Sequence, residues 1–311
     1  MEPAVITQKK PFTKARKTMS DKWYAFWLIA PALAIILFFA LVPLFYAVDV
    51  SFRHADLTMG GLQGWVGLNN YRAMLHDGKF WETVKTTVVF TFFAIIVEMV
   101  LGVAVAFLIY GATVGKGIIR SLVILPLATA PAVTGLFWRY LYDLDFGPFN
   151  YFLGLLHLPQ PNWLGDIHLG MTSLVIFDTW LWMPFVILIV LAGLQSLPRE
   201  PFEAAELDGA STFRVMRKLT FPMLSPVLTL VFILRTIDCL RLYDSVATLT
   251  RGAPGDTTET MTYYLYRQGL VFFRMDFAST MALLFMFAVI VASGFALRPL
   301  LARLAQRAGS R

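Results

Sequence analysis

Long runs of apolar residues constrain this chain more than any other feature. Crossing the hydrocarbon core of a bilayer takes about 20 consecutive apolar residues in a helix. Only helices and closed barrels satisfy every backbone polar group in lipid, and these runs are too long and continuous for barrel strands. The sequence therefore predicts an all-α membrane protein with six transmembrane helices. The six runs are Tyr24–Val48, Thr86–Tyr110, Ser121–Trp138, Met171–Gln195, Leu219–Ile237 and Phe277–Leu297.

The composition agrees with a membrane protein and disfavours a soluble or nucleic-acid-binding protein. The chain is 58% hydrophobic and 15% charged, whereas a soluble domain carries roughly 25% charged residues. In so apolar a chain the net charge of +6 favours loops that face anionic lipid over nucleic-acid binding. A single cysteine, Cys239, excludes an internal disulfide, and the four scattered histidines suggest no metal site.

The distribution of basic residues predicts the orientation. Of the 26 Lys and Arg residues, 16 fall in the short segments at the ends and between alternate runs, and 9 fall in the longer intervening loops. The positive-inside rule then places the basic segments 1–22, 111–120, 196–218 and 298–311 in the cytoplasm. We therefore expect a cytoplasmic tail over 1–22, a transmembrane domain over 23–311, and outer loops over 49–85, 139–170 and 238–276. The basic tail precedes an apolar run longer than the roughly 7–15 residues of a signal peptide, so that run is expected to be retained as a span.

One cytoplasmic loop, 196–220, carries a short charged helix between two apolar runs. Pro201 suits a first helical turn, and Glu203 there complements the helix dipole. Asp208-Gly209 predicts a turn, after which Ser211 or Thr212 is expected to cap a second short helix. An ordinary amphipathic loop helix at the lipid surface is the plainer interpretation.

The residues of this loop also resemble a known family. Glu203-Ala204-Ala205, Gly209, and Pro222 after an aliphatic residue follow the spacing of the coupling motif in membrane subunits of bacterial ATP-driven importers. Further stretches resemble the first permease subunit of maltose-type importers for sugars, polyols and glycosides. These are Val66–Tyr71 with Phe80-Trp81, Leu125-Pro126 with Pro131 and Trp138, Trp182–Phe185, Ala192–Pro198, and Tyr243-Asp244 followed by Leu249–Pro254 and Thr258–Thr260.

The resemblance implies a fold and an assembly. It implies the type I ABC importer permease fold, with a cytoplasmic coupling helix, in a bacterial cytoplasmic (inner) membrane. The implied partners are a second permease subunit, a dimer of ATP-binding subunits that hold ATP and magnesium, and an extracytoplasmic substrate-binding protein. The expected ATPase-coupling residues are Glu203, Ala204, Ala205, Asp208, Gly209 and Phe213.

Charged residues inside the apolar runs are candidates for a substrate path. A charge at mid-bilayer costs at least about 2.5–3.5 kcal/mol on insertion scales, so such a group is expected to face a cavity or a partner. Aromatic rings that stack on sugar faces are a second signal. The alternatives are a structural ion pair, such as Arg235 with Asp238, and ordinary packing for Phe177, Trp180 and Trp182. Asp178 and Trp182 share a helix face because they are four residues apart, whereas Trp180 does not. The candidate path residues are Asp178, Trp182, Glu98, Arg235 and Tyr243.

The sequence lacks the motifs of an enzyme. The stretch Gly111–Gly117 has one residue too few between its glycines for a phosphate loop, and no Ser or Thr follows Lys116. ATP is therefore expected to be hydrolysed by a separate chain. A self-sufficient secondary transporter or channel for a small polar solute is the competing function, although the internal repeat common in that class is not apparent.

Overall fold

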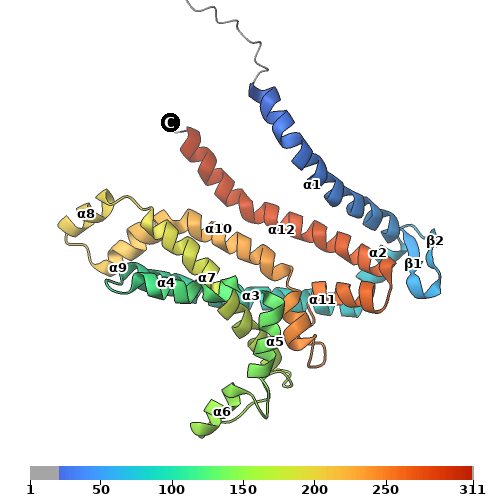
Figure 1. Cartoon of the computed structure of the whole chain (residues 1–311). Helices are drawn as coiled ribbons and strands as arrows, with labels where there is room; N and C mark the ends of the chain where they lie inside the picture. The colour runs from blue at the N-terminus through green and yellow to red at the C-terminus, as the bar shows by residue number, and fades with distance from the viewer. Residues whose placement is uncertain (1–20, 310–311) are drawn as a thin grey trace, which may run out of the picture. The chain divides into compact units, whose positions relative to one another are not determined.

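The computed structural model describes residues 21–309 and is almost entirely helical (Figure 1). Residues 1–20 of the predicted cytoplasmic tail lie outside the described residues. The elements are α1 Asp21–Ser51, β1 Arg53–Asp56, β2 Gly61–Trp65, α2 Asn69–Leu75, α3 Gly78–Gly111, α4 Lys116–Ile124, α5 Pro131–Leu141, α6 Pro148–Leu155, α7 Leu169–Gln195, α8 Glu200–Leu207, α9 Thr212–Val215, α10 Phe221–Leu240, α11 Met261–Tyr266 and α12 Met275–Gly309.

Two compact units divide within α1. The first ends at Asp49 and the second begins at Val50. The part of α1 in the first unit exposes a large apolar surface, including Trp27, Phe39 and Phe45. A helix that is apolar all round belongs in lipid or in a protein interior, which agrees with its prediction as a span.

The core of the second unit is formed by α3, α7 and α10, which pack side by side (Figure 1). Small residues allow these helices to approach closely. A Cβ atom on Gly102 of α3 would lie 2.7 Å from Val186 of α7, and one on Gly193 of α7 would lie 2.8 Å from Leu224 of α10. Van der Waals packing across small residues is the main attraction between helices in a bilayer, where the hydrophobic effect no longer acts.

Five of the six predicted spans are confirmed as parts of long helices, namely α1, α3, α7, the continuous helical segment Thr212–Leu240 and the part of α12 up to Gly294. Each is long and apolar enough to cross a membrane. The sixth run, 121–138, is not one straight helix in the structure. The chain there forms α4, a 3₁₀ turn over Leu125–Ala128, and α5, with a bend of 99° between the two arms.

Two prolines explain the bend. Pro126 lies in the 3₁₀ turn and Pro131 is the first residue of α5, while Thr129 and Ala130 between them are extended. Proline has no N–H to donate and disfavours the helical conformation of the residue before it. The two arms together make up the sixth candidate crossing.

The segments that connect these helices include the only strands among the described residues. β1 and β2 form an antiparallel hairpin whose connection includes Gly60 and Gly61, both with positive φ. Asp276 of α12 accepts hydrogen bonds from the His54 ring and from the Ala55 backbone N–H of β1. The hairpin is thereby attached to the beginning of α12.

Candidate translocation and coupling sites

Three charged side chains from three helices meet in the core. Arg235 of α10 donates from Nε and Nη2 to the two carboxylate oxygens of Glu98 on α3, at 2.6 and 2.7 Å. Nη2 also donates to Asp178 Oδ2 on α7, at 2.8 Å. Paired donors of this kind match the planar fork of a guanidinium to a carboxylate. We call Glu98, Asp178 and Arg235 the ion cluster.

The ion cluster is fully enclosed. Glu98 is 0%, Asp178 1% and Arg235 1% exposed. The guanidinium also lies 5.0 Å from the ring centre of Trp182, close enough for a cation–π contact. Its contact with Asp238, the alternative partner raised by the sequence, is longer at 3.9 Å. Buried charges need this degree of pairing because desolvation costs several kcal/mol per ion. The expectation that these three charges lie in a paired setting is confirmed.

A cavity of about 470 Å³ adjoins the ion cluster. Asp178, Trp182, Arg235 and Tyr243 line it, so four of the five candidate path residues share one space. The fifth, Glu98, is not among the lining residues and contacts the cavity only through Arg235. The sequence did not identify several residues that line the cavity. The only feature that pointed to them was a position close in sequence to Tyr243 or in the third apolar run. These are Pro131, Cys239, Arg241, Leu242, Asp244 and Ser245, beside Asp238.

One oxygen of the ion cluster has no partner. Asp178 Oδ1 is buried and accepts no hydrogen bond among the described residues, although its side chain lines the cavity. A buried acceptor left unpaired costs about 1–3 kcal/mol. A hydroxyl or water in the cavity would supply the missing donor.

The remaining aromatic candidates are engaged in packing. Phe177 is 0% exposed and its ring centre lies 5.6 Å from that of Trp138 on α5. Trp180 lies against the same Trp138 ring, at 5.3 Å between centres, and remains 39% exposed. Neither residue lines the cavity. The sequence reasoning that separated Trp182 from Trp180 by helix face therefore agrees with the geometry.

Three possible metal ligands in the core lie close together. Ligand atoms of Glu98, Asp178 and Cys239 lie within 4.8 Å of one another. The Arg235 guanidinium, however, donates to both carboxylates and approaches Cys239 Sγ at 3.3 Å. A fixed cation thus already occupies the position that a metal ion would take.

The predicted coupling helix is α8. Pro201 lies in its first turn, and Glu200 and Glu203 place negative charge at its N-terminal end. Glu203, Ala204, Asp208 and Gly209 are exposed, while Ala205 is half-buried. Leu207 and Phe213 are 90% and 72% exposed. Apolar side chains this exposed beside small residues are typical of a surface that another protein covers.

A glycine turn ends α8. Gly209 has φ +67° and donates to the Glu206 carbonyl, and Ala210 donates to the Ala205 carbonyl, at 3.0 and 2.9 Å. This is the usual left-handed ending of a helix. A Cβ atom on Gly209 would meet nothing within 4 Å. The turn therefore needs glycine for its backbone angle and not for space.

The helix after the turn differs from its prediction. Ser211 occupies the N-cap position, but its side chain makes no capping hydrogen bond. The expected separate second helix instead continues from α9 through a π-helical turn, Met216–Thr220, into α10. One continuous helical segment therefore runs from the turn after α8 to Arg235.

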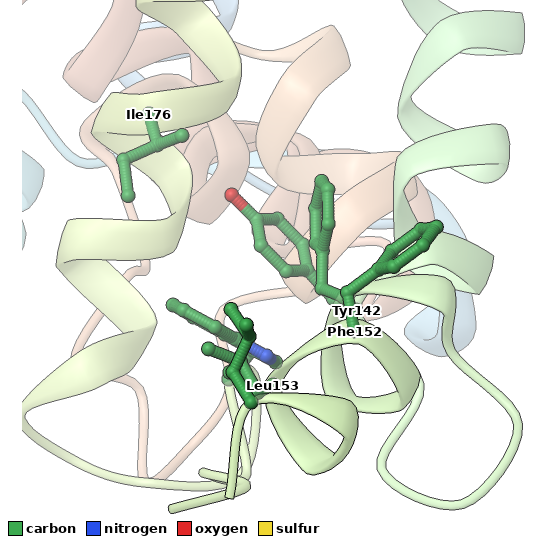
Figure 2. Close-up of a pocket in the computed structure, with 7 residues that line it drawn as sticks. Tyr142, Phe152, Leu153 and Ile176 are labelled. Atoms are coloured by element: carbon green, nitrogen blue, oxygen red, sulfur yellow. The ribbon is translucent and has the colours of Figure 1, made fainter. Parts of the chain in front are cut away.

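An aromatic cluster supports the segment between α5 and α7. Figure 2 shows Leu153 of α6 and Ile176 of α7 around a small apolar pocket, which Tyr142 and Phe152 also line. The Tyr142 hydroxyl donates to the Ser173 carbonyl at 3.1 Å, and the Trp163 ring N–H donates to Asn150 at 2.9 Å. These contacts fix α6 against α7 near the aromatic packing around Trp138.

A second charged group fixes the loop before α11. Lys79, at the start of α3, contacts Asp256 at 2.9 Å and Glu259 at 3.4 Å, and Arg267 contacts the same two carboxylates at 3.3 and 2.6 Å. The hydrogen bond from Lys79 holds the pKa of Asp256 below its ordinary value, with a smaller contribution from Arg267. The loop is thereby held by charge to the start of α3.

Comparison with known proteins decides the family. Residues 98–307 match the family described as the inner membrane component of binding-protein-dependent transport systems. The chain belongs to this family. It is therefore a permease subunit of an ABC importer that crosses the inner membrane several times, and the match spans both the ion cluster and the coupling helix.

Individual members of the family are similar over most of their length. A probable ABC transporter permease protein, y4oQ of Sinorhizobium fredii, is 37% identical over 85% of each chain. The trehalose/maltose transport system permease protein MalF of Thermococcus litoralis is 36% identical over 76% of this chain and 79% of that protein. A chain in the crystal structure of a bacterial ABC transporter that imports the acidic polysaccharide alginate has the same fold, with a TM-score of 0.81, 18% identity, and coverage of 91% and 97%.

Proposed function

We propose that this permease subunit forms half of the path by which a sugar, polyol or glycoside enters the cell. The observation that carries the proposal is the cavity beside the ion cluster. It combines the Trp182 and Tyr243 rings with the unpaired oxygen of Asp178. Sites for small polar ligands typically join apolar or aromatic walls to a few fixed polar groups.

The charges of the cavity support a neutral substrate. Asp178, Asp238 and Asp244 stand beside Arg235 and Arg241, so both signs line one space. A sugar hydroxyl both donates and accepts hydrogen bonds and can therefore pair with either sign. The similarity to trehalose and maltose permeases supports the same substrate class.

The proposal includes an assembly driven by ATP. A second permease completes the path, two ATP-binding subunits hold ATP and magnesium, and an extracytoplasmic binding protein delivers the substrate. The exposed tip of α8 and the turn, with Glu203, Ala204, Ala205, Asp208, Gly209 and Phe213, contacts an ATP-binding subunit. Because Thr212–Leu240 is one continuous helical segment, closure of the ATP-binding subunits would be carried along it toward the ion cluster.

The orientation belongs to the same proposal. Both termini lie in the cytoplasm, and α8 lies on the cytoplasmic side with them. The excess of basic residues in segments 1–22, 111–120, 196–218 and 298–311 supports this direction.

Vesicle uptake separates this function from a self-sufficient transporter or channel. Vesicles holding the complete importer and its binding protein should accumulate sugar only when ATP is hydrolysed. Vesicles holding this chain alone should accumulate none, with or without an ion gradient. Uptake by the chain alone under an ion gradient would favour the secondary transporter.

A further inference from the structure

Three cations converge on a cavity that the proposed function does not use. Lys116 and Arg120 of α4, together with Arg199 just before α8, line a space of about 410 Å³. Its inner wall is formed by the buried Ile109 and Leu191, near the ends of α3 and α7. We call this space the basic cavity.

The three cations lack acidic partners. In the part of the chain that the structure describes, no carboxylate lies within 4.0 Å of Lys116, Arg120 or Arg199. Lys116 donates to the Tyr110 carbonyl at 3.1 Å, which leaves its charge uncompensated. Like charges around one space repel each other and attract an anion.

The location of the basic cavity indicates which anion. It adjoins Tyr110, next to the last residue of α3, and Gln195, the last residue of α7. Because α3 and α7 are both candidate spans, their ends lie at a membrane surface, where lipid headgroups are found. Figure 1 shows α4 at the same end of the second unit as α8 and α9.

The first turns of α4, at the start of the sixth candidate crossing, have the side-chain pattern of a helical segment at this interface. Lys116 and Arg120 are four residues apart and share a face that lines the basic cavity. Ile118 and Leu122 lie on the opposite face and are 71% and 65% exposed. A basic face combined with an exposed apolar face is the pattern of helices at the headgroup boundary, and basic pockets between spans bind anionic headgroups.

We propose that the basic cavity binds the phosphate of an anionic phospholipid. Lys116, Arg120 and Arg199 contact the phosphate oxygens, and the apolar wall of Ile109 and Leu191 lies under the glycerol and the first methylenes. The lipid would hold α4 against the end of α7, next to the segment that leads into α8. The ligand is recognised by its negative charge, so a zwitterionic lipid should bind much more weakly.

The test is a titration of the purified, delipidated importer complex with phosphatidylglycerol, followed by native mass spectrometry. The cavity variant is Lys116→Gln/Arg120→Gln/Arg199→Gln. The matched control, Arg214→Gln/Arg217→Gln/Lys218→Gln, removes the same charge from neighbouring exposed positions that do not line the basic cavity. Because one cation near an anionic surface contributes about fivefold in affinity, the cavity variant should lose about 100-fold and Arg120→Gln alone about fivefold.

Three results would overturn the proposal. Equal losses in the cavity variant and the control would show general attraction to surface charge. Unchanged binding in both the cavity variant and Arg120→Gln would show that the basic cavity takes no lipid in the complex. Displacement of phosphatidylglycerol by millimolar inorganic phosphate would show a site for free phosphate. Phosphatidylcholine, as the zwitterionic probe, should bind the wild type and both triple variants equally.

Discussion

Replacing Arg235 by methionine should destabilise the chain more than removing the whole ion cluster. The replacement breaks three charge-assisted hydrogen bonds of 2.6, 2.7 and 2.8 Å and leaves Glu98 and Asp178 buried without a cation. Breaking a buried pair from one side costs about 3–5 kcal/mol, because an uncompensated charge remains. Loss of the contact between the guanidinium and Trp182 adds about 2 kcal/mol, because the Arg235 side chain is buried away from water.

The triple variant Glu98→Leu/Asp178→Leu/Arg235→Met should be more stable than Arg235→Met. Apolar side chains of similar volume remove the desolvation cost together with the attraction, so such replacements are often neutral or stabilising by about 1–4 kcal/mol. The control is Arg241→Met, which breaks a 3.3 Å pair with Asp238 between side chains that are 62% and 39% exposed. That pair should contribute less than about 1 kcal/mol.

The assay is reversible unfolding of the full chain in mixed micelles by increasing amounts of sodium dodecyl sulfate, followed by tryptophan fluorescence. The expected order of stability places the Arg241→Met variant near the wild type and Arg235→Met last. A triple variant less stable than Arg235→Met would refute the reasoning, because the attraction between the charges would then exceed the free-energy cost of their desolvation. So would an Arg235→Met variant within about 1 kcal/mol of the wild type.

Three further expectations concern the coupling turn, the loop before α11 and the orientation. Gly209→Val should weaken co-purification of the ATP-binding subunits, because φ +67° costs a β-branched residue at least about 1–2 kcal/mol. Gly209→Asn should leave co-purification unchanged. Equal attachment of both variants would contradict the role of the turn. Asp256→Asn should lower the melting temperature at neutral pH. The difference in melting temperature from the wild type should vanish as pH falls through the depressed pKa of Asp256, since the bond to Lys79 contributes only while the carboxylate is ionised. A difference that persists in strong acid would contradict this. A reporter inserted after Asp256 should be labelled only from outside, and labelling only from the cytoplasm would reverse the proposed orientation.

Local signals allowed the spans and the coupling turn to be predicted. A run of apolar residues needs no distant partner to indicate a crossing, and Pro201 and Asp208-Gly209 each act within one turn of the chain. The bend between α4 and α5 also had a local signal in Pro126 and Pro131. The apolar run predicted a crossing at this place but not its bend, which the two prolines determine.

Ion pairs between residues far apart in the sequence could not be predicted from the sequence. The cost of a buried charge predicts that Glu98, Asp178 and Arg235 have partners, but the rule does not name them. Glu98 and Arg235 are 137 positions apart, and Asp178 and Arg235 are 57 apart. Only the packing of α3, α7 and α10 brings them together, and the nearest acidic neighbour in sequence, Asp238, has the longest contact of the three.

The cavity as substrate path is tested most directly by comparing two tryptophans of α7. Trp182 lines the cavity against Arg235, whereas Trp180, two residues earlier, packs on Trp138 and lines no part of it. The measurement is ATP-driven uptake of the sugar by vesicles that hold the complete importer, together with its ATP hydrolysis. Trp182→Ala should lower uptake at least about fivefold while the ATP-binding subunits stay attached, because a stacking ring contributes about 1 kcal/mol and also shields the ion cluster. Trp180→Ala should transport within about twofold of the wild type, since it loses only packing at a half-exposed ring. Normal uptake by Trp182→Ala, or a larger loss in Trp180→Ala, would contradict a substrate path through this cavity.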